Sequence, residues 1–225
     1  MSYLSRPSRP CTLPRALIVV ALIATGGLSG CKILPIQTEA EKASAKAQKF
    51  DAKNFADTLW TSKGHQELLG RAVDLATLLP ALDESFDTAG QKYGLKAAGE
   101  GSPTAFVVKG EGRVTKVDTA SRAGTATLSI ATPKGNREAT LQTGPIVKGN
   151  AIRDNLPDAS FGKFTNQIEY AQAGRALNEA ALATAKPGFG ALVEGANVTF
   201  TGAITLNKPD DALLVMPIAV AGAGQ

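Results

Sequence analysis

The chain is poor in cysteine, histidine and aromatic side chains: its 225 residues include two cysteines, one histidine and 5% aromatics. Cys11 and Cys31 both lie near the N-terminus, so the remainder can form no disulfide and offers no thiol nucleophile. The single histidine, His65, excludes His-rich metal sites and a His-dependent triad elsewhere in the chain. A Walker loop, a nucleophile elbow and paired metal ligands are also absent. We therefore assign no catalytic residues, no metal and no cofactor, and expect a protein that is not an enzyme.

Long hydrophobic runs are also missing, and the longest is too short to cross a bilayer. Residues 16–28 are thirteen mostly apolar positions, whereas a spanning helix needs about 20. Arg6, Arg9 and Arg15 precede this run without any acid, which is the order of a secretory signal. Leu28-Ser29-Gly30-Cys31 then looks like a bacterial lipobox. We predict a signal peptide over 1–30 and lipid on Cys31; the alternatives are an ordinary signal with a chance cysteine, or a buried core helix.

A lipidated Cys31 predicts a periplasmic protein held at a membrane surface. One acyl chain anchors a protein only marginally, whereas two or more hold it stably. A diacylglyceryl-modified, N-acylated Cys31 would thus anchor the chain through a short tether, residues 31–37. Lys32 stands where bacterial sorting often reads an Asp as an inner-membrane retention signal, which favours the outer membrane.

The charge of the chain gives no argument for nucleic acid. Without the leader, 21 basic residues face 20 acids, so the computed pI of 9.1 reflects the leader. The strand region offers only Phe106 and Phe200 as aromatic platforms, both in buried phase, so we expect no nucleic-acid partner. Residues 104–154 hold 8 basic and 4 acidic side chains, and this segment faces either an anionic partner or solvent.

Residues 38–94 have the pattern of three helical segments. Gly64 is expected to interrupt the first, Pro80 to end the second, and Gly94 to cap the third. Residues 95–103, rich in glycine, then read as a linker.

Beyond residue 104 the period changes to two, which indicates strands. Residues 106–117 read as a bent strand or a hairpin, and two further strands follow before a helix over 165–184. Asn166 is its expected N-cap, with Glu169 completing a capping box. Two more strands end near residue 220. The prediction is an α+β fold: a helical subdomain (38–94), then a five-stranded OB-like barrel (104–220) whose helix plugs one end.

The polar residues that packing explains least lie between the third strand and this helix. A guanidinium, a carboxylate and amides there would meet at one rim of the barrel, as planar polar groups do around carbohydrates. Alternatively, Arg153 and Asp154 pin a long loop and Asn166 only caps the helix. The candidate ligand-binding residues are Arg122, Gln142, Lys148, Arg153, Asp154, Asn166 and Gln167.

Several segments carry a family resemblance: the lipobox, Ala105–Val114, Gln142-Thr143-Gly144-Pro145, Ile152-Arg153-Asp154 and Phe164-Thr165-Asn166-Gln167-Ile168. Together they resemble a family of predicted bacterial periplasmic lipoproteins of unknown function. The resemblance implies an OB-like fold and genes found beside sugar ABC transporters, and it transfers no catalytic residue. Lys148 and Asn150 depart from the family pattern, where Arg and Thr or Ser are expected. A lysine there is a point charge and replaces a bidentate contact.

The sequence therefore leads to a lipid-anchored, non-enzymatic accessory or ligand-contacting module for solute uptake. Its expected partners are membrane lipid through Cys31, and either ABC transporter components or a sugar. A structural or protein-interaction lipoprotein without a small ligand is the second hypothesis. A hydrolase using Asp154 is the third.

Overall fold

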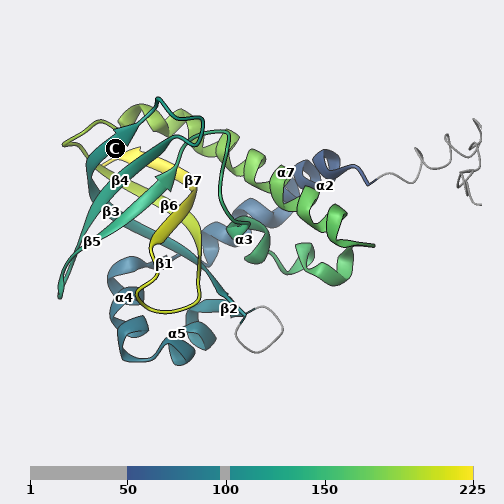
Figure 1. The fold of residues 1–225 in the computed structure, drawn as a ribbon, viewed down its shortest axis with the longest axis horizontal. Helices are drawn as coiled ribbons and strands as arrows, with labels where there is room; N and C mark the ends of the chain where they lie inside the picture. Colours follow the sequence, from purple (N-terminus) through teal and green to yellow (C-terminus); the bar gives the residue numbers. More distant parts are fainter. Residues whose placement is uncertain (1–49, 97–101, 225) are drawn as a thin grey trace, which may run out of the picture. The chain divides into compact units, whose positions relative to one another are not determined.

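Helices precede a mixed sheet in a computed structural model, which describes residues 50–96 and 102–224 (Figure 1). These residues belong to one compact unit, Phe50–Gln225. The predicted signal peptide, the lipidation site Cys31 and the tether lie outside the described residues. The helices and the mixed sheet confirm the α+β class.

The first helical stretch is continuous, and the prediction that Gly64 interrupts it was wrong. α2 (Ala52–Leu59) passes through a π-helical turn, η2 (Trp60–Gly64), directly into α3 (His65–Gly70). The N–H of His65 bonds to the carbonyl oxygen of Trp60, five residues back, so the extra residue is absorbed in a wider turn. Gly64 is buried there, and a Cβ would lie 3.0 Å from the carbonyl oxygen of Leu59.

The expectation that Pro80 ends a helix was also wrong. β1 (Val73–Asp74) leads into α4 (Leu75–Glu84), and Pro80 lies inside this helix instead of ending a preceding one. Proline at this position is tolerated because it removes a single bond on the exposed side of the helix.

After α5 (Phe86–Tyr93), Gly94 does not adopt the left-handed cap conformation. It has φ −111° and ψ 173° and begins β2 (Gly94–Lys96). Glycine is needed because β3 passes close by: a Cβ would meet Thr104 Cγ2 at 2.5 Å.

Five long strands pair in a closed ring. They are β3 (Thr104–Asp118), β4 (Thr125–Thr132), β5 (Gly135–Gln142), β6 (Asn197–Leu206) and β7 (Leu213–Gly222). The order β3–β4–β5–β7–β6 returns to β3, with β5 and β7 parallel and the other four pairings antiparallel. The short strands β1 and β2 also pair with β3.

β3 is one continuous strand, which excludes the hairpin alternative. It bends where its register with β4 shifts, between Val114 and Lys116. Gly112 lies on the inner side of this strand, where a Cβ would be 3.1 Å from Leu128 Cβ. Alternate residues of β3 face two different hydrophobic cores: Phe106 belongs to one and Val107 to the other.

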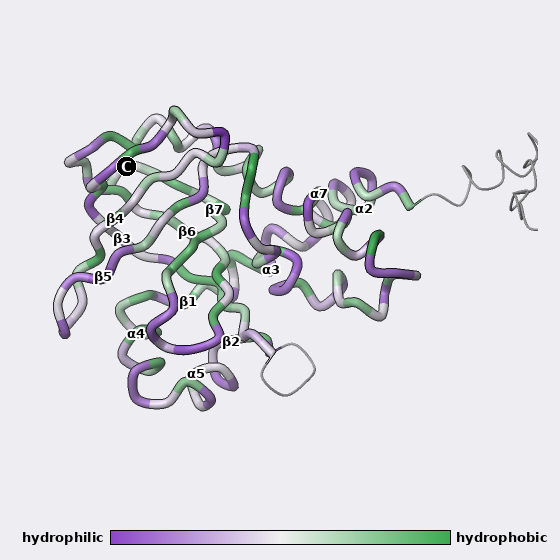
Figure 2. The backbone as a smooth tube through the Cα atoms, viewed as in Figure 1, coloured by the Kyte–Doolittle hydropathy of each residue, from purple (hydrophilic) through white to green (hydrophobic). Residues whose placement is uncertain are grey.

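Two hydrophobic cores lie on opposite sides of the strands. Figure 2 shows hydrophobic residues, in green, along both the strands and the helices. The inner core fills the ring and includes Leu75, Leu78, Leu79 and Leu82 of α4. The outer core lies between Val107, Ala203, Met216 and Ile218 of the strands and the helical residues Leu59, Trp60, Leu68, Ile152, Leu177 and Ala181, together with Leu156, which lies outside the helices.

The long helix α7 (Gln167–Ala185) therefore covers the outer face of the strands. The expectation that it plugs one end of the ring was wrong, because its apolar stripe packs against the outward side chains of β7. α4 reaches the inner core instead, and no sequence pattern distinguishes which amphipathic helix covers which face.

Asn166 is the N-cap of α7, as predicted: its Oδ1 accepts from the N–H groups of Ile168 and Glu169, both at 2.9 Å. Glu169 bonds back to the N–H of Thr165 at 3.0 Å.

Candidate functional site

The segment between β5 and α7 holds most of the candidate residues, and it is more ordered than its sequence suggests. It contains α6 (Ala151–Asp154) and the 3-10 turns η3 (Pro157–Ala159) and η4 (Phe161–Lys163). Ile152 and Leu156 are buried in the outer core, which holds the segment against α7. The segment that was expected to form a polar rim is thus partly buried, as a layer packed against α7.

Arg153 lies at the centre of this layer and is only 8% exposed. Its Nε and Nη2 donate to Asp154 Oδ1 at 3.0 and 2.7 Å, and its Nη1 donates to the carbonyl oxygen of Tyr170 at 3.2 Å. The guanidinium carbon lies 3.5 Å from the centre of the Tyr170 ring, a cation–π contact. Arg153 therefore joins α6 to the first turns of α7.

The same contacts leave hydrogen-bonding capacity around this pair. A guanidinium has five N–H donors, and three bonds from Arg153 are made within the protein. Asp154 keeps 26% of its side chain exposed. Burial raises the pKa of the Tyr170 hydroxyl above its ordinary value, although Arg153 acts in the opposite direction. Tyr170 is thus a neutral donor and acceptor at physiological pH.

A cavity of about 600 Å³ opens beside this pair. Its aromatic wall comes from Phe161 and Tyr170, whose rings meet edge to face at 5.3 Å. Lys96 at the end of β2 adds a cation, and Ser160 adds a hydroxyl. Aromatic faces beside a few fixed polar groups are typical of small-ligand pockets. Arg153 and Asp154 are the two candidate residues that line this cavity.

Gln142 and Lys148 meet each other instead of a cavity. The Gln142 side chain is 4% exposed and closes the loop that follows β5. Its Nε2 donates to the carbonyl oxygen of Lys148 at 3.1 Å, and its Oε1 accepts from the N–H of Lys148 at 2.6 Å. The side chain of Lys148 is exposed, so its contact with this site is made by the backbone.

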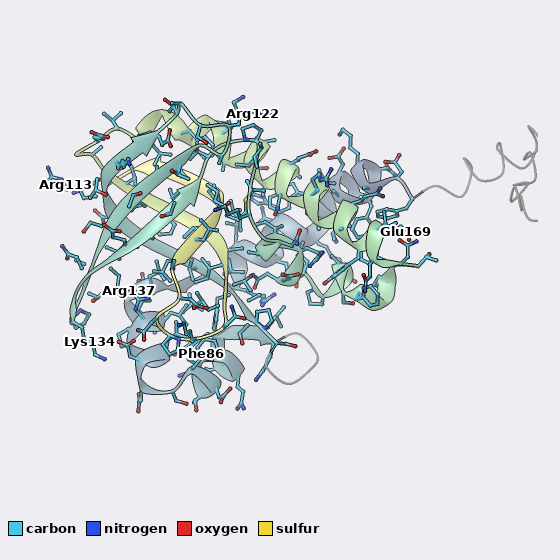
Figure 3. The ribbon with its side chains drawn as sticks, viewed as in Figure 1. Phe86, Arg113, Arg122, Lys134, Arg137 and Glu169 are labelled. Carbon is cyan, nitrogen blue, oxygen red and sulfur yellow. The ribbon has the colours of Figure 1, made fainter. Side chains whose placement is uncertain are left out.

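The remaining candidates lie on separate surfaces. Arg122 is exposed in the β3–β4 loop, where its carbonyl oxygen accepts from the N–H of Ile146 at 3.3 Å. Asn166 and Gln167 are at the start of α7, and Asn166 Oδ1 is used in capping. Figure 3 shows Arg122 well separated from Glu169 in the first turn of α7. The seven candidates therefore do not form one rim.

Sequence reasoning missed the aromatic part of this site. Tyr170, Phe161 and Lys96 are not among the candidate residues that the sequence indicates. A usable signal was present: Phe161, Phe164 and Tyr170 are spaced closely in a chain with only 5% aromatic residues. The spacing alone does not show that β2 brings Lys96 to the same place.

The described residues contain neither a metal-binding cluster nor a membrane-spanning helix. Across residues 50–96 and 102–224, no three His, Cys, Asp or Glu side chains gather as they would around a metal ion. Within these same ranges, no helix has the length and apolar character needed to cross a membrane.

Comparison with known proteins adds a family and a fold. A family model described as predicted periplasmic lipoprotein (DUF2291) matches residues 20–221. Among solved structures, the chain is similar to the crystal structure of an OB-fold protein from Thermotoga maritima, with 20% sequence identity and a TM-score of 0.60. The similarity covers 78% of this chain and 99% of that one. At this identity the likeness shows the fold alone. No curated protein matches the sequence.

Proposed function

The chain belongs to the family of predicted periplasmic lipoproteins, and on this premise we propose a non-enzymatic, membrane-anchored module that contacts a small polar solute. The leading ligand class is a sugar, and the proposed role is that of an accessory to solute uptake by an ABC transporter. The lipid on Cys31 is the anchor, and Lys32 favours the outer membrane. The OB-fold likeness and the closed ring support the OB-like barrel as the scaffold.

The observation that carries the ligand proposal is the cavity beside Arg153. Sugars present apolar C–H faces and directed hydroxyls, so they suit an aromatic wall next to planar polar groups. Phe161 and Tyr170 supply the wall, and the unused donors of Arg153 and the exposed part of Asp154 supply the polar groups. The aromatic ring and the guanidinium are held by contacts within the protein, so little order has to be gained on binding.

The second candidate, a protein-interaction lipoprotein without a small ligand, is favoured by a different observation. Arg153 and Asp154 already bond to each other, and Arg153 also bonds to Tyr170. Such a pair is complete as a structural pin. On this alternative, small molecules do not bind the cavity and do not raise the Tm, and the protein co-purifies with an envelope protein.

The test is a thermal-shift titration of residues 32–225 against monosaccharides, sugar acids and phosphates. A ligand at 100 times its Kd adds about 2.7 kcal/mol of stability, which raises Tm by several degrees for a chain of this size. We expect a selective shift that is strongly reduced in Phe161→Ala and Lys96→Ala, because both residues line the cavity at its exposed side. Arg153 is a poor test residue because its loss also disturbs the α6–α7 contact.

The matched control is Val193→Ala, which truncates an exposed apolar side chain that does not line the cavity. It should leave the ligand-induced shift unchanged. An absence of any shift over the whole panel, with all variants folded, would favour the protein-partner alternative. A ligand-induced Tm shift that remains in both cavity variants would show that the ligand binds at another surface.

A further inference from the structure

Aromatic rings gather at one end of the described unit, although the chain has few of them. Phe164 is at the centre, with its ring centre 5.5 Å from that of Phe50, 5.3 Å from Phe55 and 5.5 Å from Tyr170. Phe161 completes the group through Tyr170. These five rings, of twelve aromatic residues in the whole chain, join the start of α2 to the start of α7. Figure 1 shows both helix starts at the same end of the unit.

This end also exposes apolar side chains to solvent. Phe161 is 50% exposed, and Ile168, in the first turn of α7, is 70% exposed. Of the four large apolar side chains that are exposed within residues 50–96 and 102–224, these two lie on this end. Lys163, also exposed, lies between them in the chain. An exposed isoleucine and phenylalanine flanked by a lysine have the composition of surfaces that rest in a lipid headgroup layer.

The same end is where the anchored part of the chain enters the unit. Phe50 is the first described residue, and its ring packs on Phe164. Nineteen residue steps separate Phe50 from Cys31, which span about 68 Å at the most, because each extended residue adds at most about 3.6 Å. A tether makes contact between this end and the membrane an intramolecular event, so a surface of low intrinsic affinity is sufficient.

We propose that the aromatic end, defined by Phe161, Lys163, Phe164 and Ile168, rests in the headgroup region of the membrane that holds the lipid anchor. Phe161 and Ile168 enter the boundary between headgroups and acyl chains, and Lys163 pairs with anionic headgroups. The rings of Phe50 and Phe55 pack against Phe164 and hold its ring in place. The protein is then held in a fixed orientation, with the cavity beside Arg153 opening close to the bilayer.

The experiment uses the lipidated mature protein in vesicles of phosphatidylethanolamine and phosphatidylglycerol. The predicted lipidation leaves no free thiol in the mature chain, so Ile168→Cys and Phe161→Cys can each carry a single environment-sensitive dye. We expect nitroxide-labelled lipids to quench the dye at both positions at least twofold more than at control positions. Thermal unfolding of each labelled variant verifies that it is folded.

Two control positions separate a specific contact from a dye that inserts on its own. Lys134→Cys places the dye on the β4–β5 turn, which Figure 3 shows far from Glu169 and the start of α7. Val193→Cys replaces an apolar side chain that is 59% exposed outside the aromatic end. Equal quenching at all four positions would overturn the proposal. So would a dye at 168 that is protected in native envelopes but not in pure lipid, because the occupant is then a protein.

The outcome is independent of the ligand proposal. Ile168 does not line the cavity beside Arg153, so failure at position 168 leaves solute binding untouched. A negative sugar titration in turn leaves the membrane contact standing. Phe161 belongs to both surfaces and is therefore not used alone to decide between them.

Discussion

Arg153 shows how a residue noted from its sequence context acquires its role from packing. Its neighbour Asp154 suggested either a binding pair or a pinned loop, and the pair does form, with Nη2 2.7 Å from Oδ1. The contact that fixes the guanidinium is with Tyr170, seventeen residues away, through both its carbonyl oxygen and its ring. Periodicity predicts that α7 forms, but not which turn of it passes over α6.

Replacing Arg153 should destabilise the protein measurably. Arg153→Ala removes three hydrogen bonds and the cation–π contact, and it leaves Asp154 without its partner. We expect a loss of about 2 kcal/mol or more in the free energy of unfolding, measured by urea denaturation. The matched control Arg175→Ala removes an exposed arginine of α7 and should cost less than about 0.5 kcal/mol. Equal effects from the two variants would contradict the pinning role.

At the scale of the element, local signals held where local contacts decide and failed where tertiary contacts do. Asn166 caps α7 because its side chain bonds to its own next residues. Gly94 begins a strand because Thr104, beyond the linker, lies against it. Pro80 sits within α4, whose leucines fill the ring and outweigh the bond lost at the proline. A side-chain N-cap such as Asn166 is therefore predictable from sequence, whereas the conformation at an isolated glycine or proline is not.

The β6–β7 turn yields a prediction on pH. Asp211 Oδ2 accepts from the N–H groups of Asn207 and Lys208, at 2.7 and 3.3 Å. The backbone bond from Asn207 is the main reason that the pKa of Asp211 lies below its ordinary value. A carboxyl with a lowered folded pKa stabilises the fold above its unfolded pKa of about 3.9 and loses this effect as pH falls through the folded pKa.

We therefore expect the Tm of the wild type to exceed that of Asp211→Asn at pH 6, and the difference to shrink below about pH 4. Calorimetry across this range measures it. Asp210→Asn, a change of the exposed neighbour in the same turn, is the control and should show a smaller difference at pH 6. A constant Tm difference from pH 6 to pH 3 would show that the charge of Asp211 does not contribute to the stability of this turn.

At the scale of the whole molecule, the two cores share their strands. Phe106 faces the inner core and Val107 the outer core, so β3 cannot lose one side without exposing the other. α4 contributes Leu75, Leu78 and Leu82 to the inner core. This arrangement favours one cooperative unit over a helical subdomain that folds separately from the strands.

Unfolding should therefore be a single transition for all probes. Trp60, the chain's only tryptophan, reports on the outer core, whereas far-ultraviolet circular dichroism reports on helices and strands together. We expect the two urea curves to coincide, as two-state unfolding requires. Leu78→Ala, in the inner core, should shift both curves together. A fluorescence transition that precedes the circular dichroism transition would instead separate the N-terminal helices from the ring.

The sequence by itself determined the α+β class, the strand–helix order beyond residue 104 and the Asn166 cap. It also determined the lipoprotein assignment that the family match supports. These depend on signals that lie within a few residues of one another: a lipobox, alternation by two, and a cap beside its own helix.

Only the tertiary structure decided that α4 fills the ring while α7 covers its outer face. It alone also divided the seven candidate residues, placing Arg153 and Asp154 at a cavity with Tyr170 and Lys96, and Gln142 in a loop closure. The physical reason is the same in each case. An amphipathic pattern states that a face must be buried, whereas the partner that buries it comes from a distant part of the chain and leaves no mark in the local sequence.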